Sequence, residues 1–209
     1  MSQHHHERGF IKGPAGHLQI LYQPGEKGMP AVVVCHPHPQ YGGTMRNKVV
    51  YWIGRAFEDA GCSVLRFNFR GVEESEGDWD DGKGEADDVS AALEWLHRQH
   101  PDSPLWMAGF SFGCYAGLQA ARKNPLVEMM FAVAPAVSLW SFDFMNGETR
   151  PLTIVSGTDD EIVPFEAVRA WAKLQPEVQF HAISGAGHFF TDHMQQMTDA
   201  LLVEAGLSP

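Results

Sequence analysis

The chain has 209 residues, of which 44% are hydrophobic, and it carries a formal net charge of −11. This length and apolar content suit a globular protein with a sizeable core and exclude a disordered chain. The negative charge disfavours nucleic acids and anionic membrane surfaces as partners, because their phosphate groups would be repelled.

Short apolar segments alternate with longer amphipathic segments along the chain. Continuous apolar runs, such as A-V-V-V-C-H at 31–36, are typical of strands that are covered on both faces. The expected strands cover residues 18–22, 31–36, 63–69, 105–110, 127–134, 152–156 and 178–183. The expected helices cover residues 44–60, 85–100, 112–123 and 166–174, with a last helix after residue 188.

This alternation predicts an α/β fold, in which a mostly parallel central sheet carries helices on both faces. Thr44 is expected to cap the first helix, and Gly61 to end it. The sequence contains no linker, repeat or low-complexity segment, so we expect a single domain over residues 1–209. Within it, residues 1–9 are expected to be a flexible N-terminal tail.

Compartment can be inferred from the cysteines and from the start of the chain. The three cysteines, Cys35, Cys62 and Cys114, are odd in number and form no C-x-x-C pair, which favours a reducing compartment. The first residues contain no apolar core of a signal peptide. No apolar stretch reaches the roughly 20 residues that a membrane helix needs. We therefore expect a cytoplasmic protein that does not insert into membranes.

The segment G-F-S-F-G at 109–113 is the strongest local signal of function. It fits the pattern G-x-S-x-G between an expected strand and an expected helix, which is typical of a nucleophile elbow. The serine of such an elbow sits on a strained turn, and a side chain two residues to either side would collide with the neighbouring strand and helix. Ser111 is therefore the candidate nucleophile, and Cys114, inside the helix, is read as a packing residue.

A serine hydroxyl needs a neutral imidazole to accept its proton. His188 follows the last expected strand in the flexible segment S-G-A-G-H, and it is the candidate base. The acid that orients this histidine should follow the preceding strand, where Asp159, Asp160 and Glu161 compete. Asp160 fits the spacing G-x-x-D-x-x-V best, with Asp159 as the next choice and Glu161 behind both.

An oxyanion hole needs two backbone N–H donors. The N–H of Phe112 is one candidate, and the loop after the strand at 31–36 should supply the other. Pro37 and Pro39 have no N–H, which leaves His38 and Gln40, and we prefer His38. His36 and His38 also suggest a metal pair, but no neighbouring ligand completes a site, so we expect no metal.

Four motifs of the sequence, taken together, resemble those of a known protein family. H-P-H-P-Q-Y-G-G-T-M-R-N-K-V-V, R-F-N-F-R-G-V, G-F-S-F-G and G-A-G-H-F-F resemble a bacterial family of small, lidless α/β-hydrolases, similar to dienelactone hydrolases and small carboxylesterases. The resemblance runs from about Val32 to Phe190, and it implies the α/β-hydrolase fold, a catalytic triad of Ser111, Asp160 and His188, and no metal or organic cofactor. Dienelactone hydrolases carry cysteine at the nucleophile, so Ser111 argues against that activity.

The segment 135–151, where lids are often inserted, is too short for more than a turn or a short helix. We therefore expect minimal or no lid and an open site, with Tyr41, Trp140, Phe142 and Phe189 lining the substrate pocket. Aromatic residues of this segment equally suit a role in covering the core. The acidic residues from Glu73 to Asp88 are expected to form a solvated loop rather than a calcium site.

The predicted function is a serine hydrolase of class EC 3.1.1 that cleaves small or medium carboxylic esters through an acyl-enzyme. An acyl thioesterase is the nearest alternative, because the same residues would attack a thioester. A non-catalytic binding protein on this fold is a further alternative, which a complete triad disfavours. The expected partner is a small ester or thioester molecule; the oligomeric state is not predicted.

Overall fold

The apolar segments of the sequence pair into a sheet of eight strands in the computed structural model, which describes residues 6–208. The strand order is β1-β2-β4-β3-β5-β6-β7-β8. The first two strands and β4 pair antiparallel, whereas β4, β3 and β5 to β8 run parallel. The strands are β1 (Glu7–Gly13), β2 (Gly16–Gln23), β3 (Ala31–Cys35), β4 (Ser63–Phe67), β5 (Leu105–Phe110), β6 (Val127–Val133), β7 (Leu152–Gly157) and β8 (Val178–Ile183).

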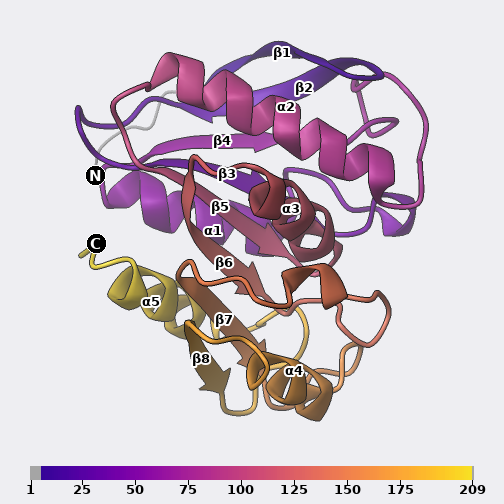
Figure 1. Ribbon diagram of the computed structural model, residues 1–209, viewed down its shortest axis with the longest axis vertical. Coiled ribbons are helices and arrows are strands. Elements are labelled where there is room, and N and C mark those ends of the chain that lie inside the picture. The colour runs from indigo at the N-terminus through magenta and orange to yellow at the C-terminus, as the bar shows by residue number, and fades with distance from the viewer. Residues whose placement is uncertain (1–5, 209) are drawn as a thin grey trace.

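Helices cover both faces of this sheet, as the sequence predicts (Figure 1). The packing of α2 and α3 forms one apolar core with one face, and α1 and α5 form a second core with the other. The helices are α1 (Lys48–Asp59), α2 (Lys83–Gln99), α3 (Phe112–Lys123), α4 (Phe165–Ala172) and α5 (Met194–Glu204), with short 3-10 helices η1 (Pro39–Tyr41) and η2 (Asp143–Met145). No helix of the described residues is long and apolar enough to cross a bilayer.

The start of the described chain differs from the sequence prediction. Glu7 to Gly9 belong to β1, so the flexible tail predicted for residues 1–9 is wrong at these positions, and residues 1–5 lie outside the described residues. A tight turn at Pro14 and Ala15 joins β1 to β2, and the turn signal G-P-A-G could have revealed the hairpin. The edge strand was missed because it is largely exposed and therefore lacks a buried apolar run.

The first helix begins later than predicted. Asn47, not Thr44, caps α1, because its Oδ1 accepts hydrogen bonds from the N–H groups of Val49 and Val50. Residues 44–46 instead connect the loop after β3 to the helix, and the N–H of Met45 donates to Asn68. This late start places the first turn of α1 beside the carboxyl end of the sheet, where the site lies.

The acidic residues from Glu73 to Asp81 are exposed, as the sequence predicts, but Asp88 is buried, and polar contacts hold the segment in place. Asp88 of α2 is buried and accepts hydrogen bonds from the backbone N–H (3.0 Å), Nε (3.0 Å) and Nη2 (2.8 Å) of Arg70. Glu73 accepts from Arg46 and from Asn68. These contacts fix both ends of a segment that brings Trp79 against the ring of His38.

Replacing Asp88 with alanine should destabilise the protein by about 3–5 kcal/mol, because it leaves the Arg70 guanidinium buried without a counter-charge. The neighbouring Asp87 is exposed and offers a matched control, for which alanine should change stability by less than about 0.5 kcal/mol. Urea unfolding of the two variants measures the difference. Equal stability of both variants would contradict the structural role of the pair.

Candidate active site

Ser111 lies on the turn between β5 and α3, in the middle of the sheet. Its φ of 56° and ψ of −117° place a non-glycine residue in a strained region of backbone space. A Cβ atom on Gly109 would lie 2.6 Å from the carbonyl oxygen of Gly113, and one on Gly113 would collide with the backbone of Cys35. The two glycines therefore allow α3 to approach β3 and β5, as the sequence predicts.

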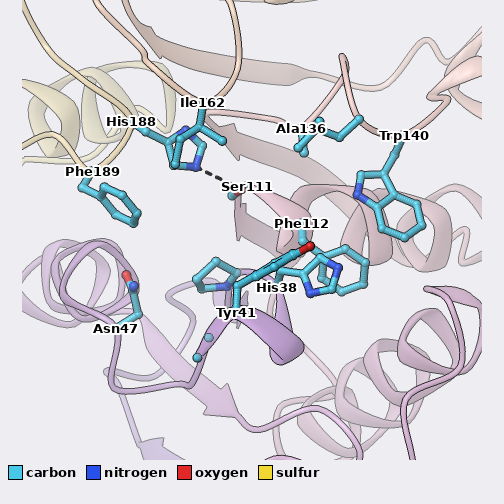
Figure 2. A pocket seen from close by; sticks show the side chains of 14 residues that line it. His38, Tyr41, Asn47, Ser111, Phe112, Ala136, Trp140, Ile162, His188 and Phe189 are labelled. Carbon is cyan, nitrogen blue, oxygen red and sulfur yellow. Dashed lines mark hydrogen bonds between the residues drawn. The ribbon is translucent and has the colours of Figure 1, made fainter.

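The structure brings Ser111, His188 and Asp160 together. Nε2 of His188 lies 3.0 Å from Oγ of Ser111 (Figure 2), and Nδ1 lies 2.8 Å from Oδ2 of Asp160. The side chains of His188 and Asp160 are 3% and 0% exposed, so both hydrogen bonds are shielded from water. With Nδ1–H donating to Asp160, Nε2 has a free lone pair to accept the serine proton.

Asp160 is selected over its acidic neighbours by backbone hydrogen bonds. Its Oδ1 accepts from the N–H groups of Ile162 (2.9 Å) and Val163 (2.7 Å), which turns Oδ2 toward His188. Asp159 is exposed and accepts instead from the hydroxyl of Thr158. The spacing argument therefore chose the carboxylate that contacts the imidazole.

Glu161 has a different position from the one that the sequence suggested. Its Oε2 accepts a hydrogen bond of 3.0 Å from the backbone N–H of His188. Asp160 thus holds the imidazole while Glu161 holds the backbone of the same residue. The spacing in the sequence selects Asp160 for the imidazole, but no sequence signal predicts the contact of Glu161, because it depends on how the loop after β8 lies against the loop after β7.

The two histidines of H-P-H point in different directions. His36 is buried, accepts a hydrogen bond at Nε2 from the N–H of Phe69 (3.0 Å) and donates from Nδ1 to the carbonyl of Pro37 (2.6 Å). Burial lowers the pKa of His36 to about 4. Both ring nitrogens form hydrogen bonds that connect the loop after β3 to the end of β4, so His36 has a structural role.

His38 begins the loop that faces Ser111. Its Nδ1 accepts a hydrogen bond of 3.2 Å from the N–H of Gln40, so the Gln40 donor is engaged. The N–H of His38 has no hydrogen-bond partner among residues 6–208. The N–H of Phe112, at the first position of α3, has no carbonyl within its own helix to bind. This pattern favours His38 over Gln40 as the second oxyanion donor.

A cavity of about 480 Å³ opens beside Ser111. Three of the residues predicted for the substrate pocket, Tyr41, Trp140 and Phe189, line it. The prediction for Phe142 is wrong: this side chain is buried against Tyr115 and other rings of the core, because η2 turns it inward. The lining consists of Pro37, His38, Tyr41, Gly42, Gly43, Asn47, Ser111, Phe112, Ala136, Leu139, Trp140, Ile162, His188 and Phe189.

The cavity wall is apolar and largely aromatic. The ring of His38 lies 4.6 to 6.0 Å from the rings of Trp79, Phe112 and Trp140. None of the lining side chains is a lysine, arginine, aspartate or glutamate. Sequence reasoning missed Asn47 and Ile162 in this lining, because both lie in segments whose direction depends on the loops around them.

Known proteins resemble this chain over most of its length. Residues 18–160 match the family model described as X-Pro dipeptidyl-peptidase (S15 family). An uncharacterized protein of Rickettsia prowazekii is 34% identical over 203 residues, which cover 92% of this chain and 85% of that protein. Its sequence similarity extends beyond the part that the family model matches.

Two solved structures are similar to this chain in both fold and sequence. An α/β serine hydrolase without a lid from Xanthomonas campestris is 33% identical, with a TM-score of 0.88, and the match covers 99% of this chain and 96% of that one. An α/β serine hydrolase homologue from Coxiella burnetii is 36% identical, with a TM-score of 0.88 over 96% of this chain and 97% of that one.

The low pKa of His36 predicts a pH dependence of stability. His36 is neutral in the folded protein down to about pH 4, whereas the unfolded chain takes up a proton below about pH 6.5. The folded state should therefore keep its full stability above pH 6.5 and lose about 3 kcal/mol as the pH falls toward 4.

Urea unfolding at a series of pH values, with the protein compared with His36→Gln and His17→Gln variants, measures this loss. The His36 variant should be less stable at neutral pH but flatter between pH 6.5 and 4. The side chain of His17 pairs with Glu76 on the surface, where such a pair contributes little to stability, so its variant should keep nearly the slope of the unchanged protein. An equal slope in all three proteins would show that His36 does not carry the effect.

Proposed function

Because the chain matches the family described as X-Pro dipeptidyl-peptidase (S15 family) and belongs with the bacterial α/β serine hydrolases without a lid, we propose that it is a carboxylesterase with Ser111 as its nucleophile. The single observation that carries the proposal is the continuous hydrogen-bond relay from Ser111 through His188 to Asp160. A strained serine, a buried imidazole and a buried carboxylate in this order are the elements of covalent acyl transfer.

In the proposed reaction, Oγ of Ser111 attacks the ester carbonyl carbon while Nε2 of His188 takes the hydroxyl proton. The N–H groups of Phe112 and His38 stabilise the negative oxygen of the tetrahedral intermediate. His188 then gives its proton to the leaving alkoxide, which departs as an alcohol. A water molecule, deprotonated by the same imidazole, hydrolyses the acyl-serine and releases the acid.

These residues supply the nucleophile, the base and the oxyanion donors, so the proposed reaction uses no metal or organic cofactor. His188 becomes positively charged during the reaction, and the adjacent Asp160 carboxylate stabilises that charge. We place the reaction in the cytoplasm, since the three cysteines are buried and unpaired.

The chemistry of the cavity favours neutral esters of small or medium size. Its volume of about 480 Å³ suits a small molecule, and its aromatic wall suits an apolar or flat group. A charged substrate group would lose its hydration without gaining a counter-charge, because no lysine, arginine, aspartate or glutamate lines the cavity.

A peptidase is the second candidate, since the matching family model is named for one. A dipeptidyl-peptidase must hold the free ammonium group of its substrate close to the scissile bond, which calls for a carboxylate in the pocket. The lining residues contain no such carboxylate. Asp160 is enclosed and used by His188, so it does not serve this purpose.

Removal of the nucleophile is the first test of this function. A fluorophosphonate probe should label Ser111 in the unchanged protein, and Ser111→Ala should abolish both labelling and the hydrolysis of p-nitrophenyl esters. Mass spectrometry of the labelled peptide locates the adduct. A folded protein that remains unlabelled would contradict the proposed function.

The adjacent carboxylates give a matched pair of variants. Asp160→Asn should lower kcat on the order of 10³- to 10⁴-fold, because the amide no longer holds the imidazole in its reactive tautomer. Asp159→Asn, one residue away and exposed, should leave kcat within about twofold, since its carboxylate does not contact His188. Steady-state kinetics on one ester measures both; similar losses would refute the assignment of Asp160.

Substrate charge is the third test. Neutral p-nitrophenyl esters should have kcat/KM values at least about tenfold above those of esters with a carboxylate or ammonium on the acyl chain, because the cavity offers no counter-charge. An X-Pro dipeptide p-nitroanilide and an acyl-CoA thioester complete the panel. Faster cleavage of either one than of the neutral esters would replace the carboxylesterase assignment by a peptidase or a thioesterase.

A further inference from the structure

The active-site cleft extends to two sides of Ser111. Figure 2 shows Trp140 and Phe112 to the right of the serine, and Phe189 and Asn47 to the left. The right side is aromatic. On the left side, the Asn47 amide is a polar group that takes no part in the relay from Ser111 to Asp160.

The orientation of the Asn47 amide is fixed by its second role in the fold. Its Oδ1 accepts hydrogen bonds from the N–H groups of Val49 (2.9 Å) and Val50 (3.4 Å) at the start of α1. Two donors meet at this atom, so it must be the oxygen, and the other terminal atom must be the NH2 group. Because the helix cap occupies Oδ1, the NH2 group at Nδ2 is the part of the amide that can donate to a ligand.

The Nδ2 group of Asn47 has no acceptor among the described residues. The side chain is half-buried and lines the cavity, and its backbone is fixed by the first turn of α1. Such a donor loses part of its hydration when a substrate fills the cleft. It regains a hydrogen bond only if the substrate itself carries an acceptor at that place.

We propose that Asn47 is a specificity-determining residue, whose Nδ2 donates a hydrogen bond to an ether, hydroxyl or carbonyl oxygen of the substrate beyond the scissile ester group. This inference rests on the proposed ester hydrolysis and narrows its substrate class. The preferred substrates are neutral esters that carry a further oxygen acceptor on the side of the cleft where Phe189 lies.

Capping alone does not require asparagine. Aspartate and serine cap helices about as well as asparagine. They keep an acceptor oxygen for Val49 and Val50 but lack the NH2 group. The variants Asn47→Asp and Asn47→Ser therefore separate the donor from the cap, and urea unfolding checks that α1 is retained in both.

The test uses pairs of isosteric esters. In the first pair, p-nitrophenyl hexanoate is compared with the ester in which an ether oxygen replaces one methylene of the acyl chain. In the second pair, the same exchange is made in the alcohol chain of an alkyl butanoate. The readout is the ratio of kcat/KM for the ether to kcat/KM for the alkyl ester, because intrinsic reactivity cancels when proteins are compared.

In one of the two pairs, this ratio should be roughly 3- to 10-fold higher for the unchanged protein than for either Asn47 variant, which is the value of one neutral hydrogen bond. An Asn124→Asp variant makes the same exchange at an asparagine whose Oδ1 also accepts a backbone N–H but that does not line the cavity, and it should keep the ratio of the unchanged protein. Equal ratios in all proteins, or an equal fall for both esters of each pair, would overturn the inference.

Labelling by a fluorophosphonate separates this inference from the proposed function. If Ser111 is labelled and the ratios do not change, only the role of Asn47 is overturned. If Ser111 of the folded, unchanged protein is not labelled and no ester is hydrolysed, the proposed function fails and the inference fails with it.

Discussion

The hydrogen bond between His188 and Asp160 joins two loops that follow different strands, β7 and β8, and the site depends on it. A carboxylate with no exposed surface is costly unless its charge is compensated. Here two backbone N–H groups and an imidazole N–H supply that compensation. The same contacts fix the imidazole ring, so its free nitrogen faces Ser111.

The parallel part of the sheet makes this contact possible. The carboxyl ends of β3, β5, β7 and β8 lie at one edge, so residues far apart in the chain share one site. Around this edge, polar side chains mainly hold loops in place. His36 ties the loop after β3 to the end of β4, Arg70 and Asp88 hold the segment that carries Trp79, and Glu161 holds the backbone of His188. The cavity that remains between these fastened loops is apolar.

An apolar cavity beside a fixed hydrogen-bond relay suggests that different residues serve the reaction and the selection of the substrate. In the proposed reaction, the relay and the two N–H donors act on the ester group itself, which all ester substrates share. On that proposal, selection among esters depends on the residues that line the cavity. The amide of Asn47 is one of the few polar side chains of this lining, which is why we propose that it contributes to selection.

The sequence by itself determined most of the strands and helices along the chain and the turn at Ser111, because burial patterns and glycine requirements are local. It also selected Asp160 and His188, since each follows a strand at a fixed spacing. It did not determine the exposed strand β1, whose pairing rather than its composition makes it a strand.

Only the tertiary structure decided the roles of several other side chains near the site. Glu161 accepts a hydrogen bond from the backbone of His188 because the loop after β8 lies against it, and Phe142 became a core residue because η2 turns it away from the cavity. Asn47, rather than Thr44, caps α1 because the preceding loop is held by contacts with distant residues. Side-chain direction in loops is set by contacts between segments distant in sequence, and no local pattern encodes those contacts.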